Sequence, residues 1–311
     1  MADVICAGMA LVDSIIRGFD PEPVSASGYR AESGTLVVGG EAVNAAMAAA
    51  KLGLKTGIFC GLGNDPAGEM IRSALEKCGV DTDRVVRTEQ TPVTTMFVRG
   101  DGTRKSVTNK AHLLQFHPER YPERFTGAKV LILGSLFRAP FDDPEAVCSV
   151  VKGAKAAGTA VFADTKLPNF RALRLGDLRD SLPLLDCITP NEDEAKFFTG
   201  QEAPEKMADA FLEAGVKSVI IKLGPDGCYW KNEAGEKLRL PGLPVKAADA
   251  TGAGDNFLAG FVSEILRGMP AAEALRFANA CGALCTTAVG AATALQSRAQ
   301  VLEWMKQFPG E

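Results

Sequence analysis

The segment Asp249-Ala250-Thr251-Gly252-Ala253-Gly254-Asp255 is the most informative stretch of the 311-residue chain. A glycine-rich turn there runs directly into an apolar segment that is typical of a helix and continues to about residue 267. Gly252 and Gly254 allow backbone conformations that point successive N–H groups at one spot, and a helix N-terminus adds partial positive charge. The segment therefore predicts an anion-binding site formed by the backbone of Gly252, Ala253 and Gly254.

Asp255 adds a carboxylate directly beside this predicted anion site. Enzymes that transfer phosphoryl groups mainly position the reactants and stabilise charge, so an anion site next to a carboxylate fits that chemistry. In the first turn of a helix, Asp255 is expected to stay ionised at neutral pH and to accept the proton of an acceptor hydroxyl. The alternative is an aspartate that only caps the helix, but the glycines and Thr251 at this spacing favour a catalytic role.

The chain resembles the ribokinase-like, or phosphofructokinase-B (PfkB), carbohydrate kinases over almost its whole length. Residues 249–255 are similar to the C-terminal signature of that family, and Gly39-Gly40-Glu41-Ala42-Val43-Asn44-Ala45-Ala46 is similar to its first signature. Two glycines before a helix admit a ligand closely, and an amide both donates and accepts hydrogen bonds. The resemblance implies that Gly39, Gly40 and Asn44 bind the hydroxyls of a sugar.

Two further motifs imply sites for ATP and Mg²⁺. Pro190-Asn191-Glu192-Asp193-Glu194 resembles the family's Asn-x-x-Glu motif, so Asn191 and Glu194 are expected to hold Mg²⁺ through water and to lie near the phosphates. An acidic first helical turn is, however, also ordinary helix design. Lys222-Leu223-Gly224-Pro225-Asp226-Gly227 resembles the nucleotide-side turn, although Gly-Pro-Asp-Gly is a common turn as well.

The resemblance also gives the remaining nucleotide and cation residues. It implies nucleotide binding by Lys222, Gly224 and Gly227, and by Asn279, which falls where the family places groups near adenine. Asp249 and Thr251 match the position at which many relatives bind a monovalent cation, so K⁺ is a candidate.

The acceptor is less well defined than the reaction. Asp13, after the first predicted strand, matches the aspartate that binds substrate hydroxyls in the family. Ribose kinases usually have asparagine where this chain has Leu11, and a lost polar partner costs ~1–3 kcal/mol of recognition. Arg104 and Lys166 are candidates for contacts with the sugar, its carboxylate or the phosphates, and solvated charges are the alternative. The segment Ala10-Leu11-Val12-Asp13 is more similar to that of fructose and ketodeoxygluconate kinases, so the resemblance implies a ketose or a keto-acid sugar, with ribose or a nucleoside as the alternative.

Short β-branched runs alternate with helical segments, which predicts an α/β fold in which helices cover both faces of a mainly parallel sheet. The resemblance implies that this is the three-layer ribokinase-like fold. Asp65-Pro66 and Asp143-Pro144 begin two of the helices. The segments at about 11–38 and 94–107 contain no convincing helix and predict a small sheet that acts as a lid over a single domain of residues 1–311.

Composition excludes several other classes of protein. The net charge of −4 comes without a basic stripe, so nucleic acid is not an expected partner. No segment has the character of a membrane span or of an export signal, and the eight cysteines contain no C-x-x-C pair, as in a reduced cytoplasmic protein. The chain lacks a G-x-G-x-x-G fingerprint and a Gly-Lys dipeptide, which argues against a dinucleotide-binding dehydrogenase and a Walker A loop.

Two alternatives concern activity and assembly. A catalytically silent sugar-binding protein on the same fold remains possible from the sequence, although the presence of Asp255, Asn191 and Glu194 favours an enzyme. Lids of related proteins often pair, so a homodimer formed through the lid is a candidate assembly.

Overall fold

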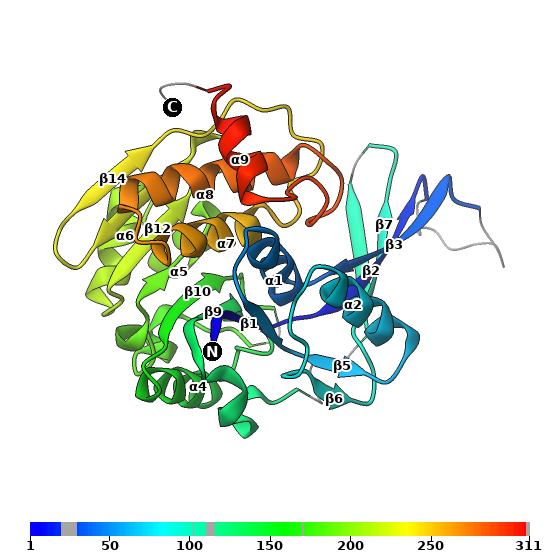
Figure 1. The fold of residues 1–311 in the computed structure, drawn as a ribbon, viewed down its shortest axis with the longest axis horizontal. Coiled ribbons are helices and arrows are strands. Elements are labelled where there is room, and N and C mark those ends of the chain that lie inside the picture. The colour runs from blue at the N-terminus through cyan, green and yellow to red at the C-terminus, as the bar shows by residue number, and fades with distance from the viewer. Residues whose placement is uncertain (20–29, 102, 110–115, 170, 309–311) are drawn as a thin grey trace.

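The computed structural model describes residues 1–19, 30–101, 103–109, 116–169 and 171–308. A large eight-stranded sheet forms its centre, in the order β14-β13-β12-β11-β10-β9-β1-β4 (Figure 1). Neighbouring strands from β4 to β12 run parallel, and β13 and β14 complete one edge as antiparallel strands. The strands are β1 (Ala2–Ala7), β4 (Thr56–Phe59), β9 (Ala128–Leu136), β10 (Ala160–Thr165), β11 (Cys187–Ile188), β12 (Ser218–Lys222), β13 (Cys228–Asn232) and β14 (Lys237–Leu240).

Helices cover both faces of this sheet. One apolar cluster joins one face of the strands to α1 (Glu41–Lys51), α2 (Pro66–Lys77), α7 (Ala253–Ile265), α8 (Ala271–Thr286) and α9 (Arg298–Met305). A second cluster joins the other face to α4 (Pro144–Ala156), α5 (Glu192–Thr199) and α6 (Pro204–Glu213). Alternate residues of β1, such as Val4 and Ile5, belong to opposite clusters, as period-two alternation requires. The predicted three-layer α/β architecture is confirmed.

The local signals for helix starts also agree with the structure. Asp65 caps α2 by accepting a hydrogen bond from the amide of Gly68, and Asp143 caps α4 in the same manner. Five short 3₁₀ helices complete the helical segments of the described residues: η1 (Pro118–Arg120), η2 (Pro122–Phe125), η3 (Leu175–Leu178), η4 (Leu182–Leu184) and η5 (Gly224–Asp226).

A separate four-stranded sheet projects from the body of the molecule (right in Figure 1). Its order is β3-β2-β7-β8, with β2 (Leu11–Arg17), β3 (Ser33–Gly39), β7 (Val93–Val98) and β8 (Arg104–Thr108). The two predicted strand-rich segments therefore do pair, through parallel contacts between β2 and β7. Residues 20–29 of the first segment and Gly102 in the predicted turn of the second lie outside the described residues. A two-stranded sheet, β5 (Gly61–Gly63) with β6 (Val86–Thr88), lies nearby (Figure 1).

Two expectations from the sequence concern the cysteines, as reduced thiols, and the helices, as non-membrane segments. All eight cysteines are free thiols, and six of them are buried. No helix within the described ranges is both long and apolar enough to cross a membrane.

Candidate active site

A cavity of about 870 Å³ lies between the small sheet and the carboxyl ends of the parallel strands. This volume is within the range of small-molecule sites. Every residue predicted for the site lines it: Asp13, Gly39, Gly40, Asn44, Arg104, Asn191, Glu194, Lys222, Gly224, Gly227, Asp249, Thr251, Gly252, Ala253, Gly254, Asp255 and Asn279, together with Lys166. The fold thus brings together motifs that are up to 266 residues apart, from Asp13 to Asn279 (279 − 13).

The start of α7 has the geometry of an anion site. Gly252 is the N-cap in a left-handed conformation (φ 78°), and it supplies no side chain to cap the helix. A Cβ atom at Gly252 would lie 2.2 Å from Cβ of Ala291, so glycine is required there. A Cβ atom at Gly254 would lie 2.8 Å from Nζ of Lys222, which places that ammonium group beside the first turn. Backbone amides and a cation therefore converge on one point.

Asp255 is buried in the first turn of α7. Its Oδ2 atom accepts a hydrogen bond of 2.8 Å from Nδ2 of Asn44 in α1. Burial raises the pKa of the carboxyl to about 7, although the charge of Lys166 and the amide of Asn44 oppose this shift. The expectation that the carboxylate stays fully ionised at neutral pH was therefore wrong. The helix N-terminus favours the charge, but removal from water outweighs it.

A network of charges surrounds Asp255. Nζ of Lys166, which follows β10, lies 3.8 Å from Oε1 of Glu41. Burial opposes the charge of Lys166, but the carboxylates of Asp255 and Glu41 outweigh it and raise its pKa. Lys222 contacts Oδ1 of Asp164 at 2.6 Å, and both side chains are largely buried. Two ammonium groups thus stand close to the start of α7, each beside an acidic side chain.

The Asn-x-x-Glu motif forms a capping box at the start of α5. Oδ1 of Asn191 accepts a hydrogen bond from the Glu194 amide at 2.9 Å, and Oε2 of Glu194 accepts one from the Asn191 amide at 3.0 Å. Oε2 also accepts a bond of 2.7 Å from the hydroxyl of Thr165. Burial, followed by the charge of Asp164, raises the pKa of Glu194. The ordinary structural interpretation of the motif is therefore correct, and both residues face the cavity as well.

Asp249 and Thr251 stabilise the loop before α7. Oδ1 of Asp249 accepts bonds from the amide and the hydroxyl of Thr251, and Oδ2 accepts one of 3.1 Å from the Gly290 amide. Burial opposes ionisation, but these bonds and the charge of Arg104 lower the pKa of Asp249. These contacts therefore favour the charged form of Asp249 behind the anion site.

The acceptor end of the cavity depends on two unusual glycines. A Cβ atom at Gly39 would lie 2.8 Å from Oδ2 of Asp13, and one at Gly40 (φ 98°) would lie 2.4 Å from the Met9 carbonyl. Burial, and then the charge of Glu41, raise the pKa of Asp13 to about 6. The glycine pair lets the chain pass close to a half-buried acid.

Asn279 is the predicted residue whose side chain is most clearly engaged elsewhere. Its Nδ2 atom donates a hydrogen bond of 3.1 Å to the carbonyl of Pro241, so it ties α8 to the loop after β14. Gly227 (φ 88°) supports the same wall, because a Cβ atom there would lie 2.1 Å from the Leu240 carbonyl.

Sequence reasoning assigned no role to four charged cavity residues: Arg17, Glu41, Arg138 and Asp164. Asp164 lies at the end of a predicted strand, which is where ligands bind in parallel sheets, so its position was a usable signal. Arg138 follows β9 in a turn with positive φ at Ser135 (67°) and Phe137 (74°). Neither residue is a glycine, so nothing in the sequence marks that turn.

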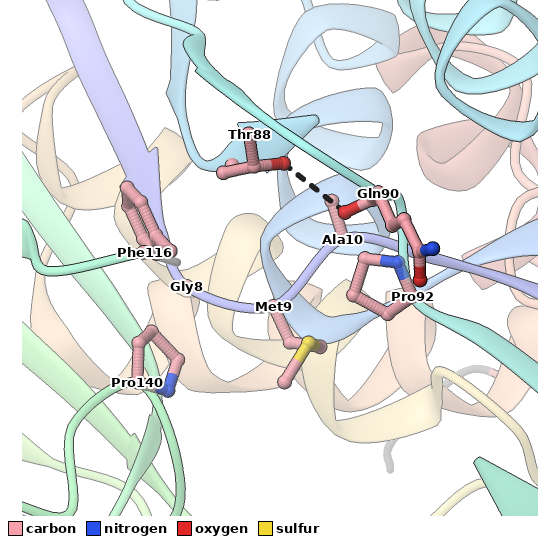
Figure 2. Close-up of a pocket in the computed structure, with 9 residues that line it drawn as sticks. Gly8, Met9, Ala10, Thr88, Gln90, Pro92, Phe116 and Pro140 are labelled. Carbon is pink, nitrogen blue, oxygen red and sulfur yellow. Dashed lines mark hydrogen bonds between the residues drawn. The ribbon is translucent and has the colours of Figure 1, made fainter. Parts of the chain in front are cut away.

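A second, much smaller cavity of about 20 Å³ lies where the chain enters the small sheet (Figure 2). Met9 and Ala10 after β1 line one side, and Gln90 and Pro92 before β7 line another. Such a volume has room for about one water molecule and for no substrate.

Comparison with known proteins shows which family the chain belongs to. Residues 1–298 match the family described as pfkB family carbohydrate kinase. The chain belongs to this family. The probable fructokinase-7 of Arabidopsis thaliana is 30% identical over 317 residues, covering 94% of this chain and 90% of its own. The 2-dehydro-3-deoxygluconokinase of Bacillus subtilis is 30% identical over 279 residues, covering 84% of each chain.

A solved structure supports the same membership. Arabidopsis thaliana ribokinase, complexed with ribose and ATP, has a TM-score of 0.85 at 26% identity and covers 98% of this chain and 99% of its own. The pfkB member described here is thus an ATP-dependent carbohydrate kinase with the ribokinase fold.

Proposed function

We propose that this kinase transfers the γ-phosphoryl group of ATP to the hydroxymethyl group of a ketose or a keto-acid sugar, with Asp255 as the base. The position of Asp255 carries the proposal. Its carboxylate lies in the first turn of α7, which has no side-chain cap, and bonds to Asn44 at 2.8 Å within the cavity that both line. A pKa of about 7 suits a group that takes up a proton near neutral pH.

The residues present fit ATP and Mg²⁺. A Cβ atom at position 254 would lie 2.8 Å from Nζ of Lys222, so that ammonium group stands close to the first-turn amides, where both can meet a phosphate oxygen. No cluster of three or more His, Cys, Asp or Glu side chains suited to a metal occurs in the described ranges, so a metal here would retain water and phosphate ligands, as Mg²⁺ prefers. When bound, Mg²⁺ neutralises charge on the phosphates.

Each residue then has a proposed task. The amides of residues 252–254 bind the transferring phosphate, Asn191 and Glu194 hold the water shell of Mg²⁺, and Asp249 with Thr251 takes a K⁺ ion. Lys222, Gly224, Gly227 and Asn279 form the nucleotide side, and Asn279 acts there by fixing the wall at Pro241. Asp13, Gly39, Gly40, Asn44 and Arg104 hold the acceptor.

The choice of acceptor rests on Leu11. It lines the cavity next to Gly39, where an apolar side chain offers no hydrogen bond to a sugar hydroxyl. The names of the fructokinase and 2-dehydro-3-deoxygluconokinase relatives support a ketose or a keto-acid sugar. Ribose or a nucleoside is the alternative within the same family. We further assign the small sheet as a lid, a possible site of homodimer contact, on one cytoplasmic domain.

A substrate panel tests the proposal. Purified protein is incubated with Mg-ATP and ketoses, pentoses, keto-acid sugars or nucleosides, and ADP release is followed. Turnover should be highest for a ketose or keto-acid sugar, and Asp255→Asn should lower kcat by about 10²- to 10⁴-fold while nucleotide binding persists. Sugar binding without turnover would favour a non-catalytic binding protein. An Asp255→Asn variant with the kcat of the wild type would show that Asp255 is not the catalytic base.

A further inference from the structure

Three arginines line the main cavity: Arg17, Arg104 and Arg138. Of these, Arg104 acts on the Asp249 carboxylate through its charge. Within the described part of the chain, none of them has an acidic oxygen within 4.0 Å, whereas the two lysines of the cavity do. Asp164 lies 2.6 Å from Lys222, and Glu41 lies 3.8 Å from Lys166. The arginines are therefore the cations of this cavity that remain available to a ligand.

Two of these arginines lie on one row of the small sheet. Arg17 ends β2 and pairs with Val98 of β7, which in turn pairs with Arg104 at the start of β8. Residues in register across neighbouring strands point to the same face, and all three line the cavity. The two guanidinium groups therefore flank Val98 on the inner face of the sheet.

The inner face changes in character along β2. Asp13 stands nearest the large sheet, Ile15 with its partner Met96 comes next, and the row of Arg17 comes last. From the large sheet outward, the inner face therefore presents an acidic side chain that can bind hydroxyls, then a pair of apolar side chains, and then two guanidinium groups. A ligand that matches this wall carries hydroxyls at one end and an anionic group toward the other.

Arg138 brings a third guanidinium group from the large sheet. Its turn is fixed by hydrogen bonds from the Arg138 amide to the Ser135 carbonyl (2.9 Å) and from the Phe141 amide to the Arg138 carbonyl (2.8 Å). Nε donates to the carbonyl of Leu167 at 3.0 Å, which uses one of the five N–H donors of the side chain. The side chain is thus anchored to the strand end beside Lys166, and its other N–H donors are available to a ligand.

We propose that the acceptor is an acidic sugar whose oxyanion is bound by Arg17, Arg104 and Arg138. The inference rests on the proposed function as a sugar kinase and selects one class within it, in preference to a neutral ketose, ribose or a nucleoside. Guanidinium groups pair bidentately with carboxylate and with phosphate alike, so either group satisfies the site. The phosphates of ATP have their own site at the start of α7, where Lys222 lies beside Gly254.

The test compares three acceptors: a 2-keto-3-deoxyaldonic acid, a ketose monophosphate and the neutral ketose fructose. Each is assayed with Mg-ATP on the full chain, on Arg138→Met and on the double variant Arg17→Met/Arg104→Met. We expect one of the two acids to have the highest kcat/KM. Each variant should lower that value roughly 10- to 100-fold, because a hydrogen bond to a charged group is lost, and should lower the value for fructose by a clearly smaller factor.

Arg239→Met is the matched control, because Arg239 is exposed on β14, pairs with Glu205 at 3.4 Å and lies outside the cavity. Melting temperature and the KM for ATP check that each variant folds. A higher kcat/KM for fructose than for both acids, or an equal loss for acid and neutral acceptors in the variants, overturns the inference. Calorimetric binding of an acid that depends on the arginines, without turnover of any acceptor, would support this site and contradict the kinase proposal.

Discussion

Nδ2 of Asn44 donates a 2.8 Å hydrogen bond to Oδ2 of Asp255, across 211 residues of sequence. Oδ1 of the same amide is buried and has no partner in the described part of the chain. The amide therefore orients the proposed base and presents an unsatisfied acceptor, which a donor hydroxyl of the substrate can satisfy.

Replacing Asn44 with leucine should shift the pH profile of the enzyme. Burial raises the pKa of Asp255 to about 7, and the Asn44 bond counteracts that rise, so its loss should raise the pKa further. Because the base acts as carboxylate, the acidic limb of kcat against pH should move to higher pH. A limb that stays in place while KM alone changes would limit Asn44 to substrate binding.

Asp255→Asn should stabilise the folded protein at alkaline pH. The pKa of Asp255 is about 7 in the folded protein and 3.8 in the unfolded chain, so the folded state binds more protons between these values. The free energy of unfolding of the wild type therefore falls as pH rises through this window. Asparagine does not ionise, so the free energy of unfolding of the variant does not fall in this window. Its Tm should therefore exceed that of the wild type by a few °C at about pH 8 and match it near about pH 4. An equal difference at both pH values would contradict the burial of a charge.

Gly252→Ala and Gly268→Ala form a matched pair for the anion site. Both glycines have left-handed φ (78° and 76°), but a Cβ at Gly252 would clash with Ala291, whereas Gly268 faces open space. Backbone strain should cost each variant about 1–2 kcal/mol of unfolding free energy in urea titrations. Only Gly252→Ala should lose a larger amount of unfolding free energy, because of the clash with Ala291, and only this variant should also lose kinase activity. Equal losses in the two variants would mean that the contact with Ala291 is unimportant.

Glu194→Gln should raise the Mg²⁺ concentration needed for half-maximal activity. The substitution keeps an oxygen that can accept the bond from Thr165 but removes the buried charge that faces the cavity. Glu192→Gln, in the exposed first turn of the same helix, is the control and should leave the Mg²⁺ titration unchanged. The same response in both variants would assign the effect to the helix rather than to the metal.

Closure of the small sheet should be visible in amide hydrogen exchange. With acceptor and a non-hydrolysable ATP analogue, exchange in β7 and β8 should slow, because their inner face would then cover the ligand. β14, at the far edge of the large sheet, should exchange at an unchanged rate. Unaltered exchange across β7 and β8 on saturation would contradict a lid.

Much of the architecture could be predicted from local patterns. The Asp-Pro helix starts at Asp65 and Asp143 and the alternation of strands and helices identified the layers, because these signals act over a few residues. The turn at residues 249–255 could likewise be predicted, because its glycines mark the left-handed backbone conformation that Gly252 adopts. Every predicted site residue lines the cavity, although their individual roles stay predictions.

The electrostatics could not be predicted in the same manner. The pKa of Asp255 depends on its burial and on the charges of Lys166, Glu41 and Asp164, which lie in α1 and at the end of β10, far from Asp255 in sequence. Arg138 was missed because the turn that positions it has positive φ at Ser135 and Phe137, where sequence statistics would look for glycine. The ammonium of Lys222 could be placed near a phosphate, but its buried pairing with Asp164 is a tertiary contact.

In the described part of the chain, the strands of the small sheet connect to the body at one end of the sheet. Leu11 pairs with Gly39, and Val12 with Val93, at that end, while Arg17 and Arg104 stand at the other. A rotation of the sheet relative to the body would therefore have its hinge beside Asp13. At about 3.3 Å per residue the arm from Leu11 to Arg17 is about 20 Å, so a 10° rotation would move its tip by about 3.5 Å. A small change in angle would thus leave the position of Asp13 almost unchanged and decide whether Arg17 and Arg104 reach a bound acceptor.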